Sequence, residues 1–237
     1  MEKGGANRYA KLAGIRFSGG YSGAMMATAV AILIGYLIGS LSFAVIVSRL
    51  AGLPDPHTYG SGNPGATNVL RSGHRIAALL TLAGDAVKGW LAVWLVREFG
   101  PAYGVSEAGA ALTGLATFLG HLFPVYFRFR GGKGVATAAG ILFAINLWLG
   151  VGTVATWLII AVFFRYSSLA ALVAALFAPF WALFLNSFRF DVTIAAIGAM
   201  SALLVWRHRA NIRNLLDGKE GRIGERRTGS EPPAEAR

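Results

Sequence analysis

A glycine-rich polar loop from Tyr59 to Arg71, YGSGNPGATNVLR, lies between long apolar stretches and contains residues suited to bind an anion. Glycines let the backbone approach a ligand and adopt positive φ angles that side chains disfavour. Successive exposed amides in such loops form anion-binding nests, and an arginine guanidinium suits an oxyanion. The residues that we expect to line the anion site are Gly60, Ser61, Gly62, Asn63, Gly65, Thr67, Asn68 and Arg71. The alternative, a flexible turn between two membrane helices, needs only one or two such residues.

A second glycine-rich stretch, Gly131-Gly132-Lys133-Gly134, opens a new apolar helix. A helix start exposes unpaired amides and the positive end of the helix dipole, and Lys133 there would complete a phosphate cradle. This is not a Walker A loop, because glycine rather than Ser or Thr follows the lysine. Basic residues flanking a membrane segment, the alternative, would account for Arg128 and Arg130, but not for three glycines around one lysine.

Two further polar stretches also follow apolar runs. In HRANIRNLLDGKE, which runs from 208 to 220, His208 and Asn211 would share one helix face, and Asn214, Asp217 and Glu220 would continue it. By itself this stretch is better explained as the basic, amphipathic end of a helix. The other stretch is RYSS, 165–168, which places Ser168 at a helix junction.

Isolated ionisable residues inside the apolar segments raise a separate question. Asp85 and Lys88 are three residues apart within a predicted span, where charged groups are costly, so we expect a structural ion pair. A proton or substrate relay is the alternative. His121 lies near a helix end, where a lone histidine is more often a structural hydrogen-bonding group than a catalyst. The scattered histidines and the absence of cysteine predict no metal site.

The composition requires a membrane. Of 237 residues, 55% are hydrophobic and only 14% are charged, whereas soluble domains carry about a quarter charged residues. The net charge of +11 is placed at the edges of apolar runs, as in membrane-flanking loops, and not in a pattern that indicates nucleic-acid binding. We therefore expect an all-α integral membrane protein.

Uncharged windows of about 20 residues predict the crossing segments. We favour about seven crossings over six, with a tight turn at the LGVG sequence of 149–152, because seven place all the polar stretches on one face. The positive-inside rule puts that face in the cytoplasm. The predicted segments are 29–47, 76–96, 108–122, two short helices within 134–164, 166–188 and 192–206.

Three regions follow from this layout. Residues 1–24 form a poorly ordered N-terminal extension in this prediction, residues 25–220 the membrane domain, and residues 221–237 a disordered polar tail. Several enzyme classes lack their signatures: there is no His-x4-Asp, no Gly-x-Ser-x-Gly and no aspartate cluster that would hold magnesium. The polar stretches thus suit anionic groups bound without metal.

Together the polar stretches closely resemble the signature motifs of the bacterial acyl-phosphate:glycerol-3-phosphate acyltransferases. The resembling segments are GSGNPGATNVLR (60–71), GHLFPVYFRFRGGKGVAT (120–137) and HRANIRNLLDGKE (208–220), with GSLSFAVIVSR (39–49) and DAVKG (85–89) in addition. The resemblance covers about residues 28–220. The chain departs from the family at Ser42, where proline is frequent, at Arg130, where lysine is common, and in its first 24 residues.

The resemblance implies transfer of a fatty acyl group from acyl phosphate to the 1-hydroxyl of sn-glycerol 3-phosphate. The products are lysophosphatidic acid and phosphate, in the first step of phospholipid synthesis. It also implies a seven-helix bundle in the bacterial inner membrane, with its motifs facing the cytoplasm. The expected partners are the two substrates and the bilayer, with no nucleic acid and no obligate protein partner.

Two phosphate-bearing substrates need two oxyanion sites, which the glycine loop and the start of the GGKG helix would supply. Lys133 beside the acyl phosphate would stabilise the departing phosphate. Acyl phosphate is already activated, so we expect no covalent acyl-enzyme, no coenzyme A, no metal and no cofactor. The expected catalytic residues are Lys133, Arg71, His208, Asn211 and Ser168, and the expected phosphate-binding residues are those of the first loop with Gly131, Gly132 and Gly134. Either His208 or the donor's own phosphate would take the hydroxyl proton.

The same residues could also serve two other functions. A transporter or channel for small phosphorylated anions would use the loops as a selectivity lining. A membrane lipid phosphatase is disfavoured, because the acidic or paired-histidine machinery is missing.

Overall fold

The structure is a computed structural model that describes residues 20–224, and this part of the chain is helical, with no β-strand. The expected all-α architecture is thereby confirmed. The α-helices are α2 (Tyr21–Gly39), α3 (Phe43–Leu50), α4 (Ala66–Leu70), α5 (Arg75–Phe99), α6 (Glu107–Leu122), α7 (Val135–Ile145), α8 (Leu147–Phe164), α9 (Ser167–Leu185), α10 (Val192–Arg207) and α11 (Arg209–Leu216), and short 3₁₀ helices are η1 (Gly100–Tyr103) and η2 (Val125–Phe127).

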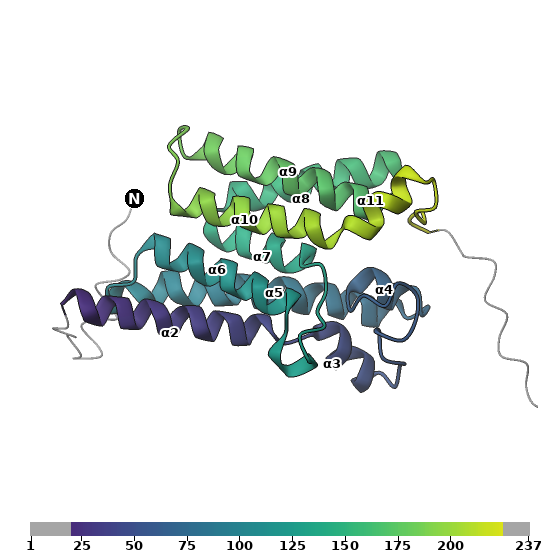
Figure 1. Cartoon of the computed structure of the whole chain (residues 1–237), viewed down its shortest axis with the longest axis horizontal. Helices are drawn as coiled ribbons and strands as arrows, with labels where there is room; N and C mark the ends of the chain where they lie inside the picture. The colour runs from purple at the N-terminus through teal and green to yellow at the C-terminus, as the bar shows by residue number, and fades with distance from the viewer. Residues whose placement is uncertain (1–19, 225–237) are drawn as a thin grey trace, which may run out of the picture.

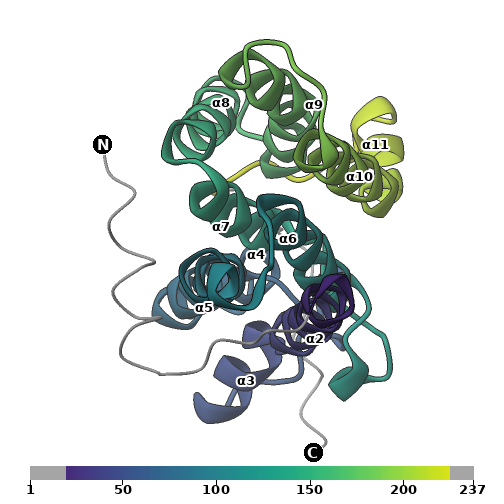
Figure 2. The same cartoon turned by 90° about the vertical axis from the view of Figure 1, so that its left-hand side faces the viewer.

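The longer helices run along one axis as a bundle (Figure 1). Viewed from one end, α6 and α7 lie between α2 and α5 on one side and α8, α9 and α10 on the other (Figure 2). Five helical stretches are long and apolar enough to cross a membrane, and α7 and α10 are shorter apolar helices. These two pack within the same bundle, α7 against α5 and α10 against α9. The count of seven crossings stays a prediction.

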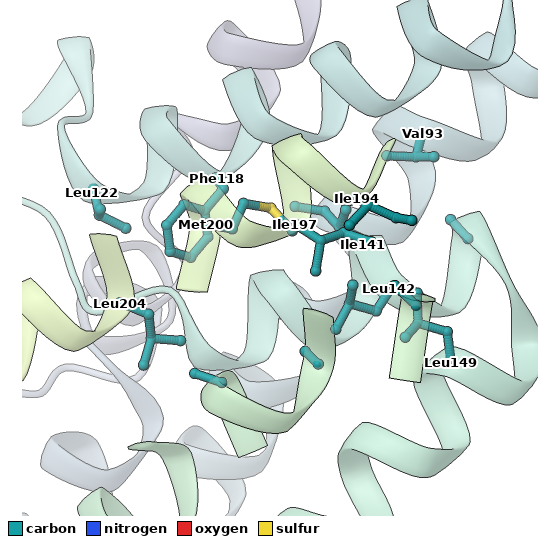
Figure 3. Close-up of a cluster of buried hydrophobic side chains, with 14 residues drawn as sticks. Val93, Phe118, Leu122, Ile141, Leu142, Leu149, Ile194, Ile197, Met200 and Leu204 are labelled. Carbon is teal, nitrogen blue, oxygen red and sulfur yellow. The ribbon is translucent and has the colours of Figure 1, made fainter. Parts of the chain in front are cut away.

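Apolar side chains lie both on the outer faces of the bundle and in its interior, as expected for helices embedded in lipid. Large apolar residues cover the outer faces; Phe163 and Phe180, for example, are 79% and 69% exposed. Inside, one apolar cluster joins the two halves of the bundle (Figure 3). Its larger members are Val93, Phe118, Leu122, Ile141, Leu142, Leu149, Ile194, Ile197, Met200 and Leu204.

Small residues set the closest helix contacts. At Gly120 of α6, a Cβ atom would lie 2.2 Å from the carbonyl oxygen of Tyr36 in α2, and at Gly140 of α7 it would lie 1.9 Å from that of Ala86 in α5. Only glycine permits such close backbone approach, as is common between membrane helices. These contacts hold α6 against α2 and α7 against α5, and the 123–134 loop connects α6 to α7.

The first predicted segment, 29–47, was wrong as a single helix. Helix α2 begins earlier, at Tyr21, and ends at Gly39, and α3 begins at Phe43 after a non-helical break. The break frees the carbonyl of Leu41, which accepts a hydrogen bond of 2.5 Å from Lys88 Nζ. An uncharged window does not reveal such a break, because the group that satisfies the freed carbonyl lies 47 residues away.

The turn predicted at 149–152 was also wrong, since these residues lie inside α8. The break falls at Asn146, whose side-chain oxygen accepts hydrogen bonds from the amides of Trp148 (2.9 Å) and Leu149 (3.1 Å). Asparagine is a preferred N-cap, because it satisfies amides that the first helical turn leaves unpaired. Gly150 serves close packing instead, since a Cβ atom there would lie 2.4 Å from the ring of Phe143.

The predicted end regions lie largely beyond the described residues. Residues 1–19 and 225–237 fall outside them. The predicted boundary of the N-terminal extension at residue 24 was wrong, because residues 21–24 form the first turn of α2. Residues 221–224 of the polar tail are described, and there the amide of Ile223 donates a 2.6 Å hydrogen bond to the carbonyl of Arg165. The start of the tail thus contacts the junction of α8 and α9.

Replacing the Asn146 cap tests the position of this break. Asn146→Ala is expected to lower the free energy of unfolding by about 1 kcal/mol, because two amides at the start of α8 lose their acceptor. Asn146→Asp keeps the acceptor and is the matched control. The free energy of unfolding in mixed detergent micelles measures the effect; equal stability of Asn146→Ala and the wild type would contradict this cap.

Candidate functional site

The predicted polar stretches gather at one end of the bundle. Figure 1 shows α3, α4 and α11 at this end, where α6 also ends and α7 begins. The α8–α9 junction with Ser168 reaches the same end, because Ser168 contacts Glu220 beyond α11. Residues far apart in the sequence therefore meet here, as the spacing of the motifs predicts.

Lys133 begins a chain of hydrogen bonds that runs through three of these stretches. Its Nζ donates to Asn211 Oδ1 at 2.5 Å, and Asn211 Nδ2 donates to Glu220 Oε1 at 2.7 Å. Ser168 Oγ donates to the same carboxylate oxygen at 2.6 Å. The structure thus brings together three of the predicted catalytic residues, Lys133, Asn211 and Ser168, and adds Glu220 as the group that joins them.

Glu220 reaches the site through a turn rather than along a helix face. Helix α11 ends at Leu216, and Gly218 adopts a left-handed φ of 68° that reverses the chain. The amides of Lys219 and Glu220 then donate to the carbonyl of Asn214, at 2.7 and 3.1 Å. Glycine favours this conformation after a helix end. The sequence shows the glycine, but the expectation of one continuous face to Glu220 was wrong.

The ammonium of Lys133 is easier to deprotonate than usual. Burial lowers the pKa of Lys133 to about 8; the nearby Glu220 carboxylate opposes this shift, and Arg71 and Arg207 reinforce it. Three cationic side chains therefore converge with one carboxylate. Such a site has an excess of positive charge, which suits an incoming anion.

His208 lies beside this site and is only 2% exposed. Its Nδ1 is 2.8 Å from the carbonyl oxygen of Leu204. A carbonyl oxygen only accepts, so Nδ1 carries the proton and Nε2 is the unprotonated acceptor. Burial lowers the pKa of His208 to about 4, and the neighbouring Lys133 and Arg207 act in the same direction. The imidazole is thus neutral at physiological pH and a weak base.

The glycine loop is shaped by Asn68. This side chain, 2% exposed, accepts hydrogen bonds from the amide (2.9 Å) and hydroxyl (3.2 Å) of Ser61 and donates to the carbonyls of Pro56 (2.8 Å) and Tyr59 (3.2 Å). Gly60 and Gly62 have φ angles of 60° and 65°. The side-chain amide of Asn68 therefore forms its hydrogen bonds within the loop, and these bonds hold the turn.

The other predicted members of the loop face outward. Ser61, Thr67 and Arg71 are exposed, and Asn63 and Gly65 are half-buried. The charge of Arg71 acts on Lys133, so the guanidinium lies on the same side as the ammonium. These side chains remain available to a ligand.

The glycines of GGKG allow the loop before α7 to pack closely against the end of α6 and against the glycine loop. A Cβ atom at Gly132 would lie 2.3 Å from His121 Nε2 and 2.8 Å from the carbonyl oxygen of Pro64 in the glycine loop. The amide of Gly132 donates to the carbonyl of His121 at 3.2 Å. Gly131 is buried, and Gly134 has a left-handed φ of 82° immediately before α7. Gly131 and Gly132 thus serve close packing between the loops.

Two further residues that the sequence did not single out, Arg207 and His57, tie the loops together. Arg207 donates from Nη2 to the carbonyl of Gly131 at 2.6 Å and from Nε to that of Gly132 at 3.1 Å. His57 Nε2 lies 2.9 Å from the carbonyl oxygen of Arg130. No sequence signal distinguishes Arg207 from an ordinary basic residue at the end of a membrane helix.

The predicted ion pair between Asp85 and Lys88 is confirmed, with 2.8 Å between Oδ1 and Nζ and both residues 3% exposed. Within residues 20–224, no three His, Cys, Asp or Glu side chains gather as metal ligands would. The arrangement at the loop end is a mostly cationic, glycine-lined site with one hydrogen-bonded carboxylate. It can bind anionic groups and stabilise a negative charge that develops during a reaction.

The chain matches known proteins over most of its length. The model of the family "Glycerol-3-phosphate acyltransferase" matches residues 29–218. A glycerol-3-phosphate acyltransferase of Cupriavidus necator is 68% identical over 202 residues, covering 85% of this chain and 99% of that protein. A Ralstonia pickettii protein of the same name is 65% identical over 86% of this chain and 97% of its own.

Solved structures agree with this match. The crystal structure of PlsY (YgiH), an integral membrane glycerol 3-phosphate acyltransferase, in its glycerol 3-phosphate form is similar with a TM-score of 0.76 and 36% identity. The similarity covers 83% of this chain and 96% of that one. The form of the same protein with lysophosphatidic acid gives a TM-score of 0.74 at 35% identity, over 83% of this chain and 95% of that one.

The role of Asn68 in shaping the loop predicts a local effect. In Asn68→Ala, the amide of Ser61 is expected to exchange hydrogen about tenfold faster or more, because it loses a buried acceptor whose loss costs about 1–3 kcal/mol. The exposed neighbour provides the control Thr67→Ala. Hydrogen exchange followed by mass spectrometry measures the rate over 56–61; unchanged exchange in Asn68→Ala would show that other groups hold the loop.

Proposed function

Because the chain belongs to the glycerol-3-phosphate acyltransferase family, we propose that it takes its acyl group from acyl phosphate and delivers it to the 1-hydroxyl of sn-glycerol 3-phosphate. The products would be lysophosphatidic acid and inorganic phosphate, in the first step of phospholipid synthesis. The similar PlsY structures, in glycerol 3-phosphate and lysophosphatidic acid forms, support the acceptor and the product.

The observation that carries the proposal is the hydrogen bond from Lys133 to Asn211, at the end of the bundle where the positive charge of Arg71 also acts on Lys133. Both proposed substrates carry a phosphate group, so a single active site must neutralise two anions. In our proposal the glycine loop with Arg71 holds one phosphate and Lys133 at the start of α7 holds the other. Acyl phosphate fits such a site better than a large coenzyme thioester, because its phosphate lies next to the reacting carbonyl.

The proposed reaction needs no covalent acyl-enzyme. The 1-hydroxyl oxygen attacks the carbonyl carbon, the bond from that carbon to the phosphate oxygen breaks, and the electron pair leaves with the phosphate. Lys133 stabilises the departing charge, a contribution that grows in a water-poor site. Orienting the two bound substrates supplies a further part of the rate, on the order of 7 kcal/mol for well-aligned pairs.

The departing phosphate is our proposed acceptor of the hydroxyl proton. His208 is the other candidate, but its pKa of about 4 makes it a poor base at physiological pH. Its unprotonated Nε2 suits a hydrogen-bond acceptor that orients the hydroxyl. The remaining groups have supporting roles: Asn211 and Ser168 hold the Lys133–Glu220 arrangement, and the exposed Ser61 and Thr67 and the half-buried Asn63 contact phosphate.

The proposed setting is the bacterial inner membrane, with the loop end facing the cytoplasm. The basic side chains at this end support that orientation under the positive-inside rule. The bilayer would then deliver the acyl donor to the site from the side, while glycerol 3-phosphate enters from water.

One assay tests the proposed donor. Purified protein with palmitoyl phosphate and labelled glycerol 3-phosphate is expected to form labelled lysophosphatidic acid, whereas palmitoyl-coenzyme A in place of the donor gives none. Equal rates with the thioester would contradict the proposal. Uptake of labelled glycerol phosphate into protein-containing vesicles, without chemical change, would instead favour a transporter.

The low pKa of Lys133 predicts a pH dependence. Lys133 must be protonated to bind phosphate, so kcat/KM, which reports groups of the free enzyme, is expected to fall above about pH 8 by about tenfold per pH unit. In Lys133→Arg, whose guanidinium stays charged, this fall should disappear up to about pH 10.

Arg128→Lys changes an exposed cation of the same loop and should keep the wild-type profile, which makes it the control. A fall above pH 8 that persists in Lys133→Arg would assign the titration to another group.

His208→Gln distinguishes the two proton acceptors. Glutamine retains a side-chain oxygen that can accept a hydrogen bond, so we expect kcat to fall by about tenfold or less. Loss of a true general base costs about 10²–10⁴-fold. A loss in that range, in protein whose stability matches the wild type, would make His208 the base.

A further inference from the structure

A buried polar cluster lies between α5, α6 and the start of α7, beneath the GGKG loop. It contains Asp85 and Lys88 of α5, His121 of α6 and Thr137 of α7, and all four are at most 7% exposed. Charged groups at such depth are costly, and a simple ion pair would already satisfy Asp85 and Lys88. The cluster extends beyond that pair to His121, which the reaction proposed above does not use.

Three groups surround the ammonium of Lys88. Nζ lies 2.8 Å from Asp85 Oδ1, with which it forms an ion pair, 2.5 Å from the carbonyl oxygen of Leu41 and 2.9 Å from His121 Nδ1. An ammonium donates hydrogen bonds and accepts none. In the contact with Lys88, His121 Nδ1 must therefore present a lone pair.

This contact fixes the tautomer of His121. Thr137 Oγ1, a second possible donor, lies 3.2 Å from the same nitrogen. Asp85 Oδ1, the carboxylate oxygen that would favour a proton on Nδ1, is 3.6 Å away, which is too long for a hydrogen bond. His121 is thus neutral, with its proton on Nε2.

The protonated side of His121 faces the loop that carries Lys133. A Cβ atom at Gly132 would lie 2.3 Å from Nε2, so the imidazole and the loop backbone are in direct contact. The carbonyl oxygen of His121 accepts a hydrogen bond from the amide of Gly132, and the imidazole Nδ1 of His121 faces Thr137. His121 therefore contacts the chain on both sides of Lys133, at positions 132 and 137.

We propose that Asp85 and Lys88 are positioning residues for the acyl transfer: they hold His121 as the Nε2-protonated tautomer under Gly132 and so fix the loop that presents Lys133. This inference rests on the proposed function for its link to catalysis, but the tautomer follows from the contacts of Lys88 alone. An ion pair that only neutralised two buried charges within α5 would need neither the contact with His121 nor a defined tautomer.

The tautomer is tested directly by ¹⁵N NMR of the full-length protein with labelled histidine. We expect His121 to show a proton on Nε2 and none on Nδ1. His208 is the internal contrast, because its contact with Leu204 requires the opposite tautomer. The two signals are assigned from His121→Gln and His208→Gln. A proton on Nδ1 of His121 would overturn the inference.

The link to the loop is tested with the double variant Asp85→Asn/Lys88→Met, which leaves no unpaired buried charge. We expect its kcat to fall by about tenfold to 100-fold, since small misplacement of a catalytic group has effects of this size. The fall of kcat/KM that starts near pH 8 should also move to higher pH, because a relaxed loop exposes Lys133 to water. The groups that face Lys133, namely Arg71, Arg207, Asn211 and Glu220, are unchanged in this variant.

Asn146→Ala is the matched control, since it weakens the start of α8 beyond the far end of α7. It should leave both kcat and the pH profile as in the wild type. An unmoved profile in the double variant, or an equal shift in Asn146→Ala, would show a merely structural role. If the wild type formed no lysophosphatidic acid, the proposed function would fail, while the NMR measurement would still decide the tautomer.

Discussion

The ammonium of Lys133 contacts the amide oxygen of Asn211 at 2.5 Å, and the rest of the site is arranged around this contact. It joins the loop before α7 to α11, which follows the last apolar helix of the bundle. Through Asn211 the contact extends to Glu220, and through that carboxylate to Ser168. Because burial makes the ammonium costly to keep charged, the site favours an anionic ligand that restores its charge balance.

The apolar surroundings determine how such a site is built. Loops cannot expose unpaired backbone groups to lipid, so the irregular segments lie at the ends of the bundle, and carbonyls at the site end find specific donors. Arg207 satisfies the carbonyls of Gly131 and Gly132, and Lys88 satisfies the one freed at Leu41. Side chains of the membrane-embedded part thereby hold loops that contact substrate in the proposed reaction.

Much of this arrangement was predictable from the sequence. The predicted layout put the glycine-rich stretches around Arg71 and Lys133 on one face, and the structure has them at one end of the bundle; that they bind anions stays a prediction. The cost of charge in lipid indicated the Asp85–Lys88 pair. The helix breaks were not predictable, because an uncharged window looks the same with or without a break, and only the cap at Asn146 marks one. Asn68 was expected to bind a ligand, yet its side chain bonds the loop's own backbone; both uses require the same residue type.

In the proposed reaction the acyl group passes directly between two bound substrates, without hydrolysis or an acyl-enzyme. Phosphate release from acyl phosphate by the purified protein, followed on the time scale of a single turnover, tests it most directly. We predict no release without glycerol 3-phosphate, and one phosphate for each lysophosphatidic acid when it is present. A burst of phosphate in the absence of the acceptor would contradict the account, because it would require a covalent acyl-enzyme or water as the acceptor.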